Sequence, residues 1–191
     1  QARLEQFAEA ENLNLEYERD ESNARGFRLI GRGGHSSKPE QANNPIEKVF
    51  RLLASVGEER RLKDLAPLLG GDNRDGRLFG LDRPGRCGTF TLVPTILRLE
   101  GGRLNLTLSI RYPENTGMAE ILEKMRRYFN DHGLAGYSIT AGNHKRPHYV
   151  EADSLLVRKL YDVYVKHTGD TRHPVRVTGA GTYAAEMGNA V

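Results

Sequence analysis

A glycine-rich loop places His35 between a strand-like run and a predicted helix. Glycines at positions 31, 33 and 34 let the backbone turn and approach a ligand closely. Two prolines stiffen the exit of this loop, and Asn43 or Asn44 can cap the helix that Pro45 starts. The sequence therefore predicts a loop that presents the His35 imidazole to a ligand. The alternative is a histidine held by the hydrogen bonds of its own turn.

Two further segments could bind an anion. Arg111 ends a strand of strictly alternating residues, and a guanidinium binds a carboxylate through two parallel hydrogen bonds. An arginine paired with Glu114 or Asp131 is the alternative. Residues 179–183 are rich in glycine and precede a predicted helix, whose first N–H groups could bind the same carboxylate.

The histidines and the cysteine do not indicate a metal site or a nucleophile. His144 and His148 have the spacing of a ligand pair on a helix, but Pro147 argues against a helix there. The Glu58-Glu59 pair lies in a charged segment and is assigned to solvent. Cys87 is the only cysteine, which excludes an internal disulfide, and it has no evident partner histidine. We therefore expect no metal ligands in this chain.

These segments lie in an ordered alternation of helices and strands. Hydrophobic spacing predicts helices at residues 2–10, 46–56, 116–130 and 154–166, with Thr116 and either Asp153 or Ser154 as caps. Strands are predicted at residues 14–18, 26–31, 89–99, 103–111, 137–141 and 174–177, with a hairpin turn at Gly101-Gly102. Residues 57–88 are predicted to form short helical turns and a long loop.

From residue 26 onward this order is βαββαβ, which is typical of a ferredoxin-like sandwich. The sequence thus predicts an α/β (α+β) fold in which one antiparallel sheet carries both helices on one face. After Pro147 the predicted helix at residues 154–166 and the strand at residues 174–177 no longer belong to this βαββαβ order. We expect two units, residues 1–148 and residues 149–191, of which the second is an incomplete piece of an α/β domain.

Composition limits the classes of function. The 191 residues carry a net charge of +3 with basic and acidic residues interspersed, which indicates a solvated surface and no nucleic-acid partner. No apolar run reaches the roughly 18 to 20 residues that span a bilayer, so we expect a soluble protein without membrane contact. The single cysteine favours a reducing, cytoplasmic compartment. Gln1 is not an initiator residue, so we expect a segment of a longer protein.

Several short motifs resemble, in this order, those of PepV-type dipeptidases. They are Gly33-Gly34-His35-Ser36-Ser37 with Pro39-Glu40 and Asn44, Arg111-Tyr112-Pro113, Pro147-His148-Tyr149-Val150, Asp162-Val163-Tyr164 before His167-Thr168-Gly169, and Gly181-Thr182-Tyr183. Such dipeptidases belong to the dinuclear zinc peptidases, together with carboxypeptidase G, aminoacylase and succinyl-diaminopimelate desuccinylase. The resemblance extends over nearly the whole chain.

The resemblance implies that residues 1–148 form a lid, or dimerisation-type, domain and that residues 149–191 return to the catalytic domain. The complete enzyme would be a metallopeptidase that hydrolyses dipeptides or N-acyl amino acids with two zinc ions. The family's zinc-ligand motifs are not found in this sequence, so we expect the fragment alone to be inactive. The expected partners are a dipeptide substrate, the rest of the catalytic domain and, as in many members, a second copy in a homodimer.

The resemblance also implies roles for individual residues. His35 would stabilise the oxyanion of the tetrahedral intermediate, and Arg111 would bind the substrate carboxylate. Asn44 would cap its helix and help to line the cleft, while Gly181 and Thr182 would contact substrate. Ala180 and Ala185 replace a glycine and an arginine that are usual in the family, which implies a shifted substrate preference or weaker activity. The alternative function is a non-catalytic ferredoxin-like module for binding or dimerisation.

Overall fold

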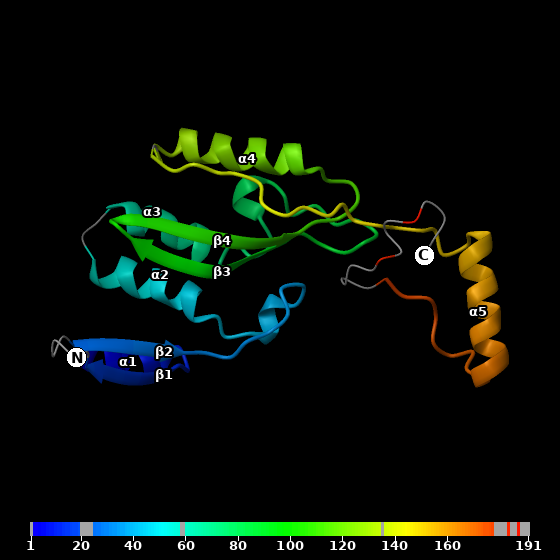
Figure 1. Ribbon diagram of the computed structural model, residues 1–191, viewed down its shortest axis with the longest axis horizontal. Helices are drawn as coiled ribbons and strands as arrows, with labels where there is room; N and C mark the ends of the chain where they lie inside the picture. Colours follow the sequence, from blue (N-terminus) through cyan, green and yellow to red (C-terminus); the bar gives the residue numbers. More distant parts are fainter. Residues whose placement is uncertain are drawn as a thin grey trace.

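The computed structural model describes residues 2–19, 25–57, 60–134, 136–177, 183 and 187. Its helices and strands alternate along the chain (Figure 1). In chain order they are α1 (Ala2–Ala10), β1 (Asn14–Arg19), β2 (Arg25–Ile30), η1 (Pro39–Gln41), α2 (Pro45–Val56), α3 (Arg60–Leu69), η2 (Arg77–Phe79), β3 (Thr91–Glu100), β4 (Arg103–Arg111), α4 (Met118–Asp131) and α5 (Leu155–Thr168). The mixed α and β composition was predicted from the sequence.

The four strands of the described residues form two antiparallel hairpins, β1–β2 and β3–β4. The register of the second hairpin runs from Glu100 opposite Arg103 to Thr91 opposite Arg111, with an irregularity between Pro94 and Ile96. Its turn uses Gly101 and Gly102 at positive φ, as the sequence predicted. The predicted single sheet is wrong for the described residues, because β2 pairs with its neighbour β1 and not with β3 or β4.

The strand predicted at residues 137–141 does not form, although its alternating residues are placed as the pattern indicated. Tyr137 and Ile139 pack against the hydrophobic core. The carbonyl oxygen of Ile139, however, accepts a hydrogen bond of 2.8 Å from the Arg126 guanidinium of α4. A side chain thus satisfies a group that a strand would have paired. Residues 174–177, also predicted as a strand, have no regular structure either.

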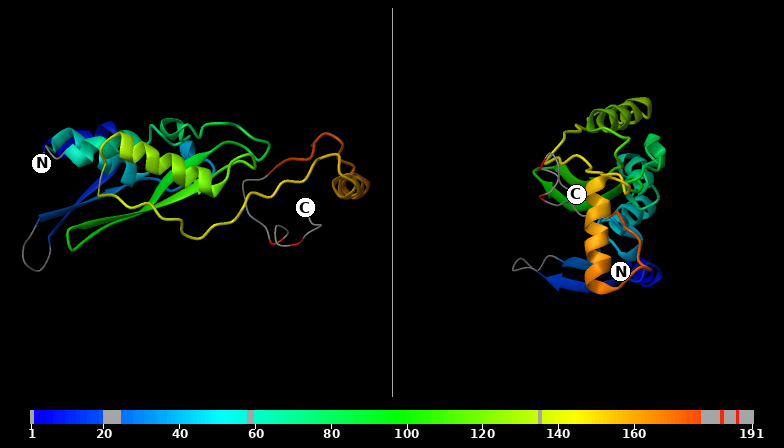
Figure 2. Two further views of the ribbon diagram at one scale, coloured as in Figure 1. Left: turned by 90° about the horizontal axis from the view of Figure 1, so that it is seen from above. Right: turned by 90° about the vertical axis from the view of Figure 1, so that its right-hand side faces the viewer.

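The main core lies where α2, α3 and α4 pack around the β3–β4 hairpin. Its most buried members include Phe50, Leu81, Phe90 and Ile121, each at most 1% exposed. Figure 1 shows the β3–β4 hairpin between α4 and α2, with the β1–β2 hairpin and α1 to one side. Figure 2 shows α5 at the opposite end of the molecule from α1. No helix in the described ranges has the length and apolarity that crossing a bilayer requires.

Two details of the helices differ from the predictions. Helix α3 forms inside the predicted long loop and contains Pro67. Its apolar side, with Leu65 and Leu68 only 3% and 2% exposed, joins the core, and this burial outweighs the cost of the proline. Helix α4 starts after Gly117, so Thr116 is not its cap. The Ser154 cap of α5 is confirmed, because Ser154 Oγ accepts a hydrogen bond from the Val157 N–H.

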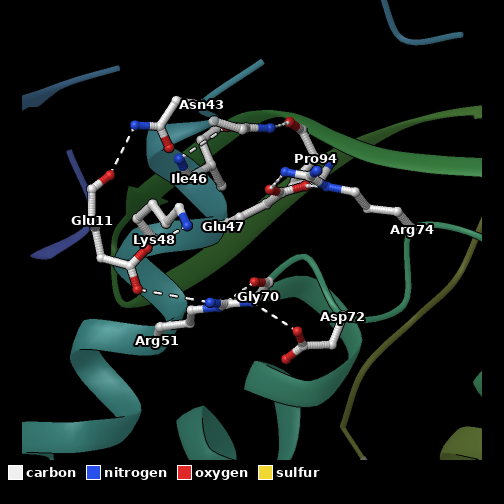
Figure 3. A network of polar contacts seen from close by, with 11 residues as sticks. Glu11, Asn43, Ile46, Glu47, Lys48, Arg51, Gly70, Asp72, Arg74 and Pro94 are labelled. Carbon is white, nitrogen blue, oxygen red and sulfur yellow. Dashed lines mark hydrogen bonds and ion pairs between the residues drawn. The ribbon is translucent and has the colours of Figure 1, made fainter. Parts of the chain in front are cut away.

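Polar contacts tie α2 to two other segments (Figure 3). Glu47 is 1% exposed and forms a two-point ion pair with Arg74, whose Nε lies 3.0 Å from Oε1. Lys48 pairs with Glu11 after α1, and Arg51 reaches Asp72 at 2.7 Å. These contacts fix the first turns of α2, and with them the exit of the loop that carries His35.

Candidate functional site

The loop before α2 is closed by a short backbone bridge between Arg32 and Asn43. Each residue donates its N–H to the carbonyl of the other, at 3.0 and 2.8 Å. The Asn43 side chain donates to the carbonyls of Glu11 and Asn12 at 2.9 and 2.8 Å. A Cβ on Gly31 would fall 2.0 Å from the Asn43 carbonyl oxygen. Gly31 is therefore needed for the close approach of two backbone segments within the fold.

His35 is exposed at the far end of this loop. Its Nδ1 atom lies 2.7 Å from Ser37 Oγ and 3.3 Å from the Ser37 backbone nitrogen. Its carbonyl accepts a hydrogen bond from the Lys38 N–H at 2.9 Å. The hydrogen bonds of the turn, which were the alternative interpretation of His35, are therefore present. They engage Nδ1 and orient Nε2 away from the turn.

Arg111 approaches His35 from the end of β4, 76 residues further along the chain. Arg111 Nη2 lies 3.5 Å from His35 Nε2, and Arg111 Nε donates to Ser36 Oγ at 3.0 Å. A guanidinium can only donate, so accepting from Arg111 requires a ring with its proton on Nδ1, whereas accepting the Ser37 N–H at Nδ1 requires a ring with its proton on Nε2. The structure thus brings together two residues that the sequence singled out separately.

Asn44 uses both ends of its side-chain amide within the fold. Oδ1 accepts from the Ile46 N–H at 3.0 Å, which confirms the predicted cap of α2. Nδ2 donates to the Pro94 carbonyl at 2.8 Å, beside the irregularity in β3. Asn44 therefore joins the loop to the hairpin that carries Arg111. Gly181 and Thr182, the other two predicted substrate contacts, lie outside the described residues.

The turn after β4 is anchored by Glu114. Its carboxylate accepts the N–H groups of Arg86 and Cys87, each at 2.9 Å. These two hydrogen bonds, that of Cys87 first, lower the pKa of Glu114 to about 2. Glu114 was predicted as an alternative partner of Arg111, whereas here it binds the 85–88 turn. Burial, and secondarily Glu114, raises the pKa of the Cys87 thiol, which disfavours a reactive thiolate.

His144 and His148 lie in an extended segment without helix, as Pro147 indicated. The His144 ring stacks on Tyr112 with the ring centres 5.9 Å apart, and its Nε2 contacts the tyrosine hydroxyl. The carbonyl oxygen of His148 accepts a hydrogen bond from the Cys87 thiol at 3.7 Å. Within the described residues, no three histidine, cysteine, aspartate or glutamate side chains gather as metal ligands.

Sequence reasoning missed Ser36 and Thr91. The Thr91 hydroxyl donates to the Ser36 carbonyl at 3.1 Å, and Ser36 Oγ accepts from Arg111. In the sequence, Ser36 stood out only as the residue after His35 in the Gly33-Gly34-His35-Ser36-Ser37 motif, with no role of its own. Its partners lie 55 and 75 residues away, so only the folded chain shows the contacts.

The sequence of this chain is similar to those of several proteins named dipeptidases. No family model matches the chain. It is 27% identical over 160 residues to the Beta-Ala-Xaa dipeptidase of Lactobacillus delbrueckii, covering 81% of this chain and 33% of that protein. The chain is also similar to two proteins with provisional dipeptidase names. It is 33% identical over 116 residues to one from Staphylococcus saprophyticus, covering 61% of this chain and 24% of that protein. It is 32% identical over 168 residues to one from Staphylococcus aureus, covering 84% of this chain and 34% of that protein.

The chain therefore spans between a quarter and about a third of the length of these relatives. It is a mixed α and β protein whose sequence is similar to dipeptidases over most of its own length. These names do not favour the alternative of a non-catalytic module.

Proposed function

We propose that this chain is part of a dipeptidase that hydrolyses dipeptides or similar N-acyl amino acids. The observation that carries the proposal is the meeting of Arg111 and His35 at 3.5 Å, from segments 76 residues apart. A positive guanidinium and an imidazole at one point suit a substrate that has both a carboxylate and a carbonyl. The similarity to proteins named dipeptidases supports this class of substrate.

In this proposal Arg111 binds the carboxylate of the substrate through charge-assisted hydrogen bonds. His35 faces the carbonyl that is attacked, and its Nε2–H tautomer or its cation donates to the oxyanion of the tetrahedral intermediate. The contact of Nε2 with Arg111 then gives way to a shared contact with the ligand. Asn44 holds the loop and borders the cleft, and the N–H groups near Gly181 and Thr182 supply further contacts to the carboxylate.

The proposed enzyme is a zinc metallopeptidase of the PepV type with two zinc ions. The described residues do not gather three potential ligands, so they do not fit a zinc site and we derive no step through the metal. The ions would be held by other parts of the complete enzyme. The chain's own contribution would be to bind and orient substrate.

We further propose that residues 1–148 are the lid, with a ferredoxin-like order of elements, and that residues 149–191 belong to the catalytic domain. The lid would close over the peptide. The order β2, α2, β3, β4, α4 and the core that α2, β3, β4 and α4 share support the first assignment. The second is supported by α5, where Leu155, Leu160 and Val163 are 67%, 50% and 53% exposed, as expected of a helix that packs against another domain. Homodimerisation and a cytoplasmic location are part of the same proposal.

Steady-state hydrolysis of a dipeptide by the complete enzyme with added zinc tests this function. Arg111→Ala should raise KM about 10- to 100-fold, because charged hydrogen bonds to the carboxylate are lost. His35→Ala should lower kcat about 100- to 1,000-fold, as for a lost oxyanion donor. Arg98→Ala, which changes an exposed arginine of β3, is the matched control and should change neither. An inactive complete enzyme, or activity of the 191-residue chain alone, would contradict the proposal.

A further inference from the structure

Ser36 lies between the two proposed substrate-binding side chains and bonds to both strands of the β3–β4 hairpin. Its hydroxyl accepts the Arg111 Nε–H at 3.0 Å. Its carbonyl accepts the Thr91 hydroxyl at 3.1 Å. Because Ser36 directly follows His35, a fixed Ser36 backbone also fixes the start of the His35 side chain.

The hairpin register explains why one residue can hold both contacts. Thr91 and Arg111 are directly opposite in the β3–β4 ladder, so their side chains lie on the same face. Thr91 is 9% exposed and its hydroxyl has limited freedom. The short threonine reaches the loop backbone, and the long arginine passes beside it to the serine hydroxyl. The loop is therefore attached at one point to a cross-strand pair.

We propose that Ser36 is a positioning residue that sets the Arg111 guanidinium and the His35 imidazole relative to each other. This inference rests on the proposed function for its consequence, which is that Ser36 affects substrate affinity without touching substrate. An arginine side chain has several rotatable bonds, and ordering it on binding costs affinity. A hydrogen bond that holds Nε in the unbound protein removes part of that cost beforehand.

The first test observes the Arg111 Nε–H group by NMR in the ¹⁵N-labelled 191-residue chain, with Arg111→Lys to assign the signal. In the wild type this proton should exchange with water at least about tenfold more slowly than that of the exposed Arg98, because it is hydrogen-bonded. Ser36→Ala should abolish the protection, and Ser36→Thr, which keeps a hydroxyl, should restore it. Lys38→Ala, which changes an exposed side chain of the same loop, is the control and should leave the protection unchanged.

The second test measures the dissociation constant of alanyl-alanine for the same variants by chemical-shift titration. Ser36→Ala should weaken binding about five- to tenfold, and Ser36→Thr should regain most of the loss. Unfolding curves confirm that all variants are folded. No protection in the wild type, protection that survives Ser36→Ala, or unchanged affinity in Ser36→Ala beside a weakened Arg111→Ala would each overturn the inference.

The two proposals fail in different ways. If the wild-type chain does not bind alanyl-alanine, the proposed function loses its support. The exchange of the Arg111 Nε–H still decides whether Ser36 holds the guanidinium.

Discussion

Asn44 offers a direct test of how the site is held, because its amide has partners in two parts of the fold. Oδ1 caps α2 through the Ile46 N–H, and Nδ2 binds the Pro94 carbonyl of β3. Loss of an N-cap costs about 1 kcal/mol. Loss of a hydrogen bond to a partly buried carbonyl costs about as much again. We therefore expect Asn44→Ala to lower the free energy of unfolding by about 2 kcal/mol.

Asn44→Ser separates the two contributions. Serine caps a helix about as well as asparagine, but its side chain is too short to keep the hydrogen bond to Pro94. We expect a loss of about 1 kcal/mol for this variant. In a chain of this size 1 kcal/mol lowers Tm by about 2–4 °C, so the two variants are distinguishable. Asn105→Ala, an exposed position in β4, is the control and should change the free energy of unfolding by less than about 0.5 kcal/mol.

Urea unfolding at pH 7 measures these free energies, and hydrogen exchange at the Ile46 amide reports on the cap alone. Asn44→Ala should lose protection at Ile46, whereas Asn44→Ser should keep it. A fully stable Asn44→Ala chain would refute the assignment of both bonds. Equal losses in the two variants would refute the contribution of the cap.

Three other perturbations test separate contacts. Since hydrogen bonding holds the pKa of Glu114 at about 2, below its ordinary 4.5, its carboxylate stabilises the fold above about pH 4.5 and this contribution is lost as the pH falls toward 2. The unfolding free energies of wild type and Glu114→Gln should differ at pH 6 and converge near pH 2. Arg74→Met leaves the buried Glu47 carboxylate unpaired and should cost about 3 kcal/mol in urea unfolding, and Glu47→Leu in the same chain should recover much of this loss. Gly31→Ala should lower Tm strongly because its Cβ would lie 2.0 Å from a carbonyl oxygen, whereas Gly33→Ala, with no atom within 4 Å of its Cβ, should be tolerated.

The elements that sequence reasoning located correctly are those whose signals are local. The alternation of leucines in residues 103–111 and the glycine pair before it define the β3–β4 hairpin, because both strands and the turn lie within about twenty residues. The start of α2 was also predicted correctly from local residues, since Asn44 caps the helix and Pro45 occupies its first turn. At these positions the local preference and the final fold agree.

Errors arose where a tertiary contact decided between local alternatives. Residues 137–141 have the alternation of a strand, but their pairing depends on a free strand edge, and Arg126 takes the Ile139 carbonyl instead. Residues 57–88 were predicted to form only short helical turns and a long loop, whereas burial of Leu65 and Leu68 in the core favours the continuous helix α3. The pairing of β2 was mispredicted for the same reason. No local feature of β2 specified that, among the described strands, it pairs with β1 alone.

The candidate site shows both cases at once. Residue type and loop composition were sufficient to single out His35, Arg111 and Asn44, and the fold places His35 beside Arg111. The residue that joins them, Ser36, could not be identified, because its importance comes from a cross-strand pair that only the β3–β4 register brings under the loop.

For His35 the sequence left two alternatives, a ring held by its own turn and a ring presented to a ligand. The structure makes them compatible, since they concern different nitrogen atoms. Ser37 engages Nδ1 at 2.7 Å, and Arg111 lies at Nε2. A ring fixed at Nδ1 has its remaining nitrogen in a defined direction, which is the arrangement that a donor to a developing charge requires. The hydrogen bonds of the turn thus orient the side that the proposed function would use.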